Sequence, residues 1–227
     1  MGRERMDVLA GIDAMIEERH LLTHPFYAKW VAGTLPREAI QDYARQYYAF
    51  EAAFPRFLSA IHARTDRAEV RQHLLKNLWD EEHGPENHAE LWLRFAEGMD
   101  VGREDVAGAT RNAATEALVR TYREATTEGP VAAGIAAIHA YEAQVPRVAR
   151  AKIDGLREHY GVEDYRTLAF WEVHERLDLE HAGAERAMLE DLAAEDPDAA
   201  LEATDRALSA WWAFLDGVDP EGAATAA

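Results

Sequence analysis

Hydrophobic residues recur along most of the chain with the spacing of an α-helix. Apolar side chains return every three or four positions, and glycine and proline fall between the periodic stretches instead of inside alternating, strand-like patterns. The sequence therefore predicts an all-α protein, a compact helical bundle. Its helices are expected at about residues 5–19, 25–34, 37–64, 67–83, 86–98, 110–127, 130–159, 163–193 and 198–216.

Proline and glycine mark the expected interruptions of this pattern. Pro55 and Pro146 lie within long helical patterns, so we expect kinks there. Gly84-Pro85 predicts a break or bend between two helices. No repeat, long linker or low-complexity block is evident, which favours a single domain over 1–227, with its core at about 5–216 and a frayed tail at 217–227.

One predicted helix carries polar residues on the face that should be buried. In "VHERLDLEHAGAE", His174, Asp178 and His181 are spaced four and three apart. A helix advances about 100° per residue, so the three side chains point the same way. The same face holds large apolar residues, namely Phe170, Trp171, Leu177, Met188 and Leu192.

Two further apolar stripes show the same anomaly. In "LLKNLWDEEHGPENHAELWLRF", Glu81 and His88 are two helical turns apart and share a stripe with Leu74, Leu78, Trp92 and Phe95. In "VAAGIAAIHAYEAQVPRVA", Glu142 aligns with Val131, Ile135, Ile138 and Val145. Three stripes therefore bring six candidate ligands toward one core.

Such residues have ordinary explanations when taken singly, because a core histidine can be hydrogen-bonded and a glutamate can pair with arginine. As a set they indicate a metal site. No Lys or Arg falls within ~60° of the centre of any stripe, and buried carboxylates without cations would cost several kcal/mol each. Two divalent ions in the bundle core would supply the charge. Carboxylate and imidazole ligands without sulfur suit iron or manganese, and Fe/Fe, Mn/Mn and mixed pairs all remain open.

Composition narrows the classes of partner. The chain has 42 acidic and 24 basic residues, a net charge of −18, which disfavours nucleic acid and anionic membranes. It has no cysteine, no signal-like apolar segment and a mean hydropathy of −0.38. We expect a cytoplasmic protein that acts on small molecules only. A homodimer is compatible with the sequence, which leaves the oligomeric state open.

The pattern Glu81-x6-His88, Glu142 and His174-x3-Asp178-x2-His181 resembles the haem-oxygenase-like dimetal oxidases and oxygenases, whose fold is a bundle of about seven helices. Within them the chain is most similar to the group of the Chlamydia protein associating with death domains and its bacterial relatives. The resemblance spans about residues 8–216. It is carried by "HPFYAKW", "YYAFEAAFPRFLSAIHAR", "NLWDEEHGPENHAELW", "AAGIAAIHAYEAQVPRVARAKI" and "HERLDLEHA".

This resemblance implies oxygen-dependent synthesis of p-aminobenzoate, a folate precursor, from the protein's own side chains. Tyr27 in "PFYAKW" would supply the ring and Lys152 in "ARAKID" the amine, with dioxygen and a reductant as co-substrates. Tyr43 and Tyr141 are candidate relays. Lys152 is also notable because only three lysines accompany 21 arginines, and a buried lysine can lose its proton and act as a nucleophile.

Three other functions remain open from the sequence. An ordinary dimetal oxygenase acting on a fatty acid or amino acid fits the six ligands equally well. A metal-free relative of the thiaminases or quinone-cofactor synthases fits less well, since the thiaminase type uses a cysteine and the ligands would be unexplained. A non-catalytic interaction protein has no residue pattern in its favour.

Overall fold

The helices begin and end where proline, capping side chains and glycine set their limits. His24 caps the helix that starts at Pro25, because its ring nitrogen accepts a hydrogen bond from the Phe26 amide. Asp164 and Asn112 cap two later helices in the same way. Gly161 takes a positive φ of 69° just after another helix ends at His159.

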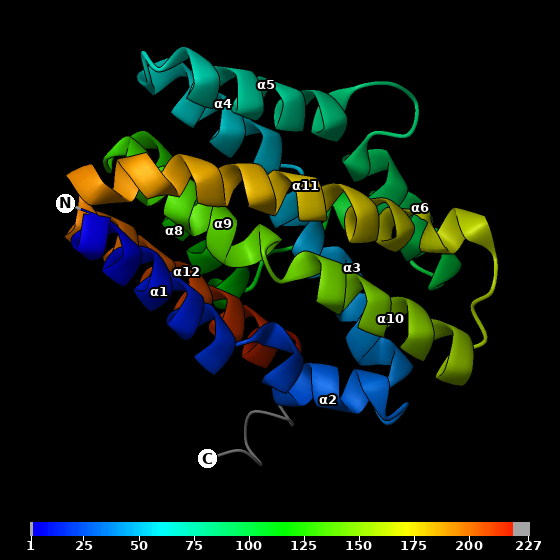
Figure 1. Ribbon diagram of the computed structural model, residues 1–227. Coiled ribbons are helices and arrows are strands. Elements are labelled where there is room, and N and C mark those ends of the chain that lie inside the picture. Colours follow the sequence, from blue (N-terminus) through cyan, green and yellow to red (C-terminus); the bar gives the residue numbers. More distant parts are fainter. Residues whose placement is uncertain (1, 220–227) are drawn as a thin grey trace.

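The computed structural model describes residues 2–219, with side chains from residue 8 (Figure 1). The all-α class is confirmed, and the described residues contain no strand. The helices are α1 Gly2–Glu18, α2 Pro25–Val31, α3 Arg37–Glu51, α4 Phe54–Arg64, α5 Ala68–Glu82, α6 His88–Gly98, α7 Arg103–Ala107, α8 Ala113–Thr127, α9 Val131–Glu142, α10 Val145–His159, α11 Tyr165–Glu195 and α12 Pro197–Val218. A short 3-10 turn, η1, covers Leu21–Thr23.

The long helix α11 runs through the middle of the bundle (Figure 1). It packs against α10, α9, α6 and α1, while α12 packs against α9, α8 and α1. The helix α5 lies across α4 at one side and also touches α11 and α6. This arrangement surrounds the predicted polar face of α11 with the helices that carry the other candidate ligands.

At both predicted proline kinks the chain divides into two helices, joined by two residues that keep right-handed helical dihedrals. Pro55 and Pro146 each stand in the first turn of a new helix, so α3 ends at Glu51 and α9 ends at Glu142. A proline in the first turn lacks only an N–H that has no helical acceptor there. The expected helices 37–64 and 130–159 are therefore two helices each, and each break leaves a buried glutamate at a helix end.

The C-terminal end departs from the expectation in one respect. Residues 217 and 218 belong to α12, whereas we expected the frayed tail to start at residue 217. Asp219 follows the helix and accepts a hydrogen bond of 2.7 Å from the Lys29 ammonium, which ties this end to α2. The rest of the expected tail, residues 220–227, lies outside the described residues.

Candidate active site

The six predicted metal ligands converge from four helices. Glu81 lies near the end of α5, His88 is the first residue of α6, and Glu142 is the last residue of α9. The other three come from consecutive turns of α11 and complete the set: His174, Asp178 and His181. None of the six is more than 4 % exposed, so the structure brings them together inside the protein.

A tight turn between α5 and α6 sets the relative position of Glu81 and His88. Gly84 has a positive φ of 81°, and Asn87 caps α6 by accepting from the Glu90 amide at 3.0 Å. The helices are separate rather than one bent rod. Glu81 and His88 nevertheless meet, with 3.0 Å between Glu81 Oε1 and His88 Nδ1.

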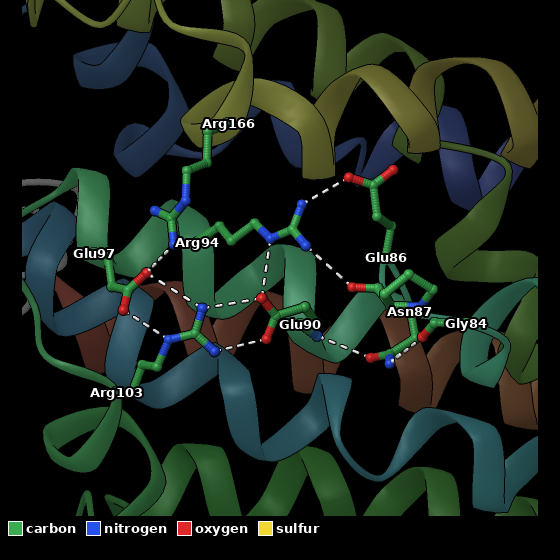
Figure 2. Close-up of polar contacts among 9 residues, drawn as sticks. Gly84, Glu86, Asn87, Glu90, Arg94, Glu97, Arg103 and Arg166 are labelled. Atoms are coloured by element: carbon green, nitrogen blue, oxygen red, sulfur yellow. Dashed lines mark hydrogen bonds and ion pairs between the residues drawn. The ribbon is translucent and has the colours of Figure 1, made fainter.

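An ion-pair network holds the beginning of α6 in place (Figure 2). Arg94 donates to Glu86, to Glu90 and to the Pro85 carbonyl. Arg103 bridges Glu90 and Glu97 with bonds of 2.6–3.3 Å, and Arg166 of α11 also pairs with Glu97. The network therefore connects the turn after Glu81 to α6, α7 and the start of α11.

Two of the histidines are oriented by hydrogen bonds on their outer nitrogens. The Phe170 carbonyl lies 2.8 Å from His174 Nδ1, and the Asp80 carboxylate lies 3.2 Å from His181 Nε2. Each contact holds a ring N–H and leaves the other nitrogen with a lone pair facing inward. Metal-binding histidines are held in this way, so both rings fit a metal site.

Other side chains of the cluster also lie close to one another. The rings of His88 and His174 have centroids 4.3 Å apart. His181 Nδ1 lies 3.7 Å from Asp178 Oδ1 and 3.9 Å from Glu142 Oε2. The latter separations are too long for hydrogen bonds, so these atoms face one another without a direct bond.

Several buried atoms of this cluster have no hydrogen-bond partner. They are Glu81 Oε2, His88 Nδ1, Asp178 Oδ2 and His181 Nδ1. Although His88 Nδ1 is 3.0 Å from Glu81, it lacks hydrogen-bond geometry toward that oxygen. A buried unpaired polar group costs about 1–3 kcal/mol, and more when charged. Divalent cations would satisfy all of these atoms, and an oxygen–nitrogen donor set suits iron and manganese. The residues therefore fit a metal centre.

The pKa values follow from crowding of these groups in the protein interior. Burial raises the pKa of Asp178 to about 6 and that of Glu142 well above its usual range, with Glu185 adding to the latter. Burial acts to lower the pKa of His88 and His181, but neighbouring carboxylates prevail and raise each to about 9. Without cations, the cluster therefore favours protonated forms.

Two residues of the cluster, Glu51 and Asn77, were not predicted from the sequence. Glu51, at the end of α3, is 4 % exposed, and it can place a ligand atom within 4.8 Å of those of His88 and His174. Asn77 donates to both oxygens of Glu142 at 3.0 and 3.3 Å. Glu185, one turn beyond His181, lies 3.4 Å from His139 Nδ1. Glu51 shares the helical face of Ile40, Tyr43, Tyr47 and Phe54, so the stripe argument used for Glu142 would have found it.

Lys152 lies in an aromatic enclosure. Its Nζ atom donates to Tyr43 Oη at 2.6 Å and stands 3.8 Å from the centre of the Trp171 ring and 5.0 Å from that of Tyr27. Lys152 is only 2 % exposed, and burial lowers its pKa well below the usual range. The side chain is thus suited to carry a neutral amine with a lone pair.

The candidate tyrosines form a row beside this lysine. Tyr27 interacts with Tyr43 through its hydroxyl, the Tyr43 and Tyr47 rings have centroids 5.5 Å apart, and the Tyr47 and Tyr141 hydroxyls are hydrogen-bonded. Burial raises the pKa of all four phenols. Tyr47 was missed by the sequence analysis, yet it joins the two predicted relays.

The aromatic enclosure adjoins the polar cluster through α11. Trp171 contacts the lysine, and His174 lies one turn further along the same helix. Phe170 fills the space between them, with its ring 4.1 Å from the His174 ring and 6.1 Å from that of Tyr47. The Phe170 ring therefore stands between His174 and Tyr47.

Residues 41–214 match the family described as iron-containing redox enzyme. The chain belongs to this family. The expected resemblance to haem-oxygenase-like proteins is thereby confirmed, and an oxidoreductase is supported over a non-catalytic interaction protein. In the described part of this redox enzyme, no helix is long and apolar enough to cross a membrane.

Named relatives share most of the length of this redox enzyme. A 4-aminobenzoate synthase of Chlamydia muridarum is 42% identical over 93% of the chain and 89% of its own length. A 4-aminobenzoate synthase of Nitrosomonas europaea is 42% identical over 91% and 89%. The crystal structure of a TenA homolog from Pseudomonas syringae pv. tomato superposes with a TM-score of 0.79 at 14% identity, covering 96% of this chain and 92% of that one, which supports the shared fold.

Proposed function

We propose that the protein makes 4-aminobenzoate from its own Tyr27 and Lys152 with a dinuclear Fe/Mn centre, dioxygen and a reductant. The observation that carries the proposal is the position of the Lys152 amine, enclosed by aromatic rings, 5.0 Å from the Tyr27 ring centre and beside the polar cluster. The names of the relatives from Chlamydia muridarum and Nitrosomonas europaea support the same product.

The proposed product matches the atoms of the two side chains. 4-Aminobenzoate has a ring, one carboxyl carbon and a nitrogen opposite that carbon. Tyrosine has a ring, Cβ and a phenolic oxygen opposite Cβ. Conversion therefore requires cleavage of the Cα–Cβ bond of Tyr27 and oxidation of Cβ to the carboxyl group by dioxygen. It also requires exchange of the phenolic oxygen, which leaves as water, for the nitrogen of Lys152, whose Cε–Nζ bond breaks and whose Cε is left as an aldehyde.

Six residues would hold the metal ions: Glu81, His88, Glu142, His174, Asp178 and His181. When bound, two iron or manganese ions would activate dioxygen with electrons from the reductant. The protein contributes the rest through its own side chains. The Tyr141, Tyr47 and Tyr43 row gives an electron a path away from Tyr27.

Lys152 is prepared for amine transfer by its surroundings. The Tyr43 hydroxyl accepts a hydrogen bond from Nζ and fixes its position. Because burial lowers the pKa of Lys152, the lone pair is available at neutral pH. The enclosure also excludes water, which would otherwise compete for an oxidised ring.

The test is to follow the origin of the ring. Protein built with ring-labelled tyrosine, then given Fe(II), Mn(II), a reductant and oxygen, should release labelled 4-aminobenzoate, because Tyr27 supplies the ring. Labelled free tyrosine should contribute nothing. Product should stop at about one molecule per chain, far below the ~1–1000 per second of a cycling enzyme, and intact-protein mass spectrometry should find the matching loss from the polypeptide.

Tyr27→Phe is the matched control, since it keeps the ring packing and lacks the phenol. It should bind metal normally and release no product. Many turnovers on an added fatty acid or amino acid, with the Tyr27→Phe protein fully active, would replace this proposal by an ordinary dimetal oxygenase.

The net charge also bears on the partners and the location that we propose for the protein. A net charge of −18 favours small-molecule partners over nucleic acid or anionic membranes. We infer a cytoplasmic location, compatible with a homodimer.

A further inference from the structure

Glu51 is a buried carboxylate that the proposed function does not use. It ends α3, is 4 % exposed, and its Oε1 atom has no hydrogen-bond partner. An unpaired carboxylate in the interior is unfavourable unless a cation or donor compensates it. The described residues provide no such donor for this oxygen. This oxygen is therefore available to bind a cation.

The surroundings of Glu51 indicate which cation it would bind. One ligand atom each of Glu51, His88 and His174 can be chosen so that all three lie within 4.8 Å of one another. Among the described residues, this is the one group of three histidine, aspartate or glutamate side chains that satisfies this spacing. Atoms so placed can share a single ion after small side-chain rotations, and the two-nitrogen, one-oxygen set suits iron or manganese.

A second observation comes from an internal likeness in the chain. Glu51 begins "EAAFPR" and Glu142 begins "EAQVPR". Both glutamates end a helix, and in both cases the next helix has proline in its first turn. We expected no repeat from the sequence, and this short one emerges because the two breaks have the same structure. It makes Glu51 the counterpart of the predicted ligand Glu142.

The likeness continues along both halves of the chain. After each break, one helix follows, and then comes a pair of candidate ligands seven positions apart: Glu81 with His88, and His174 with His181. An alanine follows His88 and also His181. A helix-end glutamate therefore precedes the ligand pair in both halves, but of these two helix-end glutamates the predicted ligand set includes only Glu142.

We propose that Glu51 is a seventh metal ligand, bound to the ion that His88 and His174 hold, as the first-half equivalent of Glu142. The inference rests on the metal centre of the proposed function and adds a residue to it. Under this assignment each half of the chain contributes one glutamate from a helix end to the centre.

Metal affinity tests the assignment without an activity assay. Glu51→Gln keeps the size of the side chain and removes its charge, so the fold should persist, as circular dichroism would verify. Calorimetric titration with Mn(II), with Mn(II) electron paramagnetic resonance as the second readout, should give two ions per wild-type chain and at least a tenfold weaker affinity at one site in the variant. Glu82→Gln is the control, because this exposed carboxylate lines the same surface hollow as Glu51 and Glu81.

A crystal of wild-type protein soaked with Mn(II) gives a direct reading. Anomalous scattering should place a Glu51 oxygen at ~2.0–2.3 Å from an ion, the usual metal–oxygen range. Two wild-type ions with unchanged affinity in Glu51→Gln, or no ion within about 3 Å of a Glu51 oxygen, would overturn this assignment alone. A wild-type protein that binds no Mn(II) or Fe(II) would overturn both this assignment and the proposed metal centre.

Discussion

Lys152 combines features that surface lysines lack. Its amine is enclosed by Tyr27, Tyr43 and Trp171, and burial is the cause of its lowered pKa. The other two lysines behave differently, since Lys29 pairs with Asp219 and Lys76 pairs with Glu180 at the surface. An arginine in the same enclosure would remain charged, because its pKa exceeds 12. Position 152 therefore calls for a side chain that can become neutral.

Replacing Lys152 by methionine should abolish 4-aminobenzoate formation and leave metal binding intact. Methionine has a similar length and packs well among aromatic rings, but it has no nitrogen to transfer. The check is product quantification by mass spectrometry beside a metal titration. Lys76→Arg is the control, expected to match wild type because Lys76 is exposed. A Lys152→Met protein that still yields one product per chain would exclude Lys152 as the nitrogen source.

The candidate residues differ in how far the sequence could identify them. His174, Asp178 and His181 were identifiable because one helix carries all three, so their spacing alone fixes a common face. Tyr47 and Asn77 were not, because tyrosine or asparagine on an apolar stripe is compatible with ordinary packing. Their relevance arises from contacts between distant segments, Tyr47 with Tyr141 and Asn77 with Glu142.

At the scale of elements, the turn between α5 and α6 depends on the network in Figure 2. Glu90 accepts hydrogen bonds from both Arg94 and Arg103, and the Arg103 bond is the largest of the effects that lower its pKa to about 2. The side chain remains about a quarter exposed, so solvent weakens these pairs. The network's contribution to stability is accordingly modest and should depend on pH.

Glu90→Gln should lower the free energy of unfolding by about 1 kcal/mol at pH 7, because two charged contacts become neutral. The pKa is lowered in the folded state, so the stabilisation is present above the ordinary value and is lost as the pH falls toward 2. Urea unfolding from pH 7 to pH 3 should therefore show the difference from wild type shrinking below about pH 4.5. Glu104→Gln, at an exposed residue of α7, should have little effect. A difference that stays constant across this range would contradict the linkage.

Element boundaries show a clear limit of sequence reasoning. The periodic pattern runs through Pro55 and Pro146 without changing phase, so it predicted two long kinked helices. Whether proline bends a helix or starts a new one depends on how neighbouring helices pack, which the local pattern does not contain. The breaks matter because they turn Glu51 and Glu142 into helix-end residues that face the cluster.

At the scale of the whole molecule, the cluster opposes folding when no cation is bound. Burial raises the pKa of Glu142 and of Glu51 well above the usual range, that of Glu185 to about 8 and that of Asp178 to about 6. The fold keeps these carboxyl groups together at the expense of stability. The aromatic and aliphatic core around them compensates, with large buried rings contributed by Trp30, Trp92, Trp171 and Trp211. Functional sites commonly carry such a cost.

The metal-free and metal-loaded proteins should therefore respond oppositely to pH and to loss of a carboxylate. Groups with raised pKa values stabilise the fold at low pH, and this contribution is lost as the pH rises through their folded-state values. The melting temperature of the metal-free protein should then fall between pH 7 and pH 8, where Glu185 loses its proton and buried histidines with lowered pKa values, such as His139, are already neutral in both states. Glu142→Gln should raise it by a few degrees at pH 8.

With Fe(II) or Mn(II) bound, the effect of pH on the melting temperature and the effect of Glu142→Gln should both reverse. Metal binding requires deprotonated ligands, so added metal should stabilise the protein more at pH 8 than at pH 5. Glu142→Gln should now lower the melting temperature, because a neutral amide is a weaker ligand than a carboxylate. Scanning calorimetry of wild type and Glu142→Gln, each with and without metal, gives the four melting temperatures. Glu82→Gln is the exposed control. If Glu142→Gln shifted the metal-free and metal-loaded proteins in the same direction, Glu142 would be acting in packing and not in metal binding.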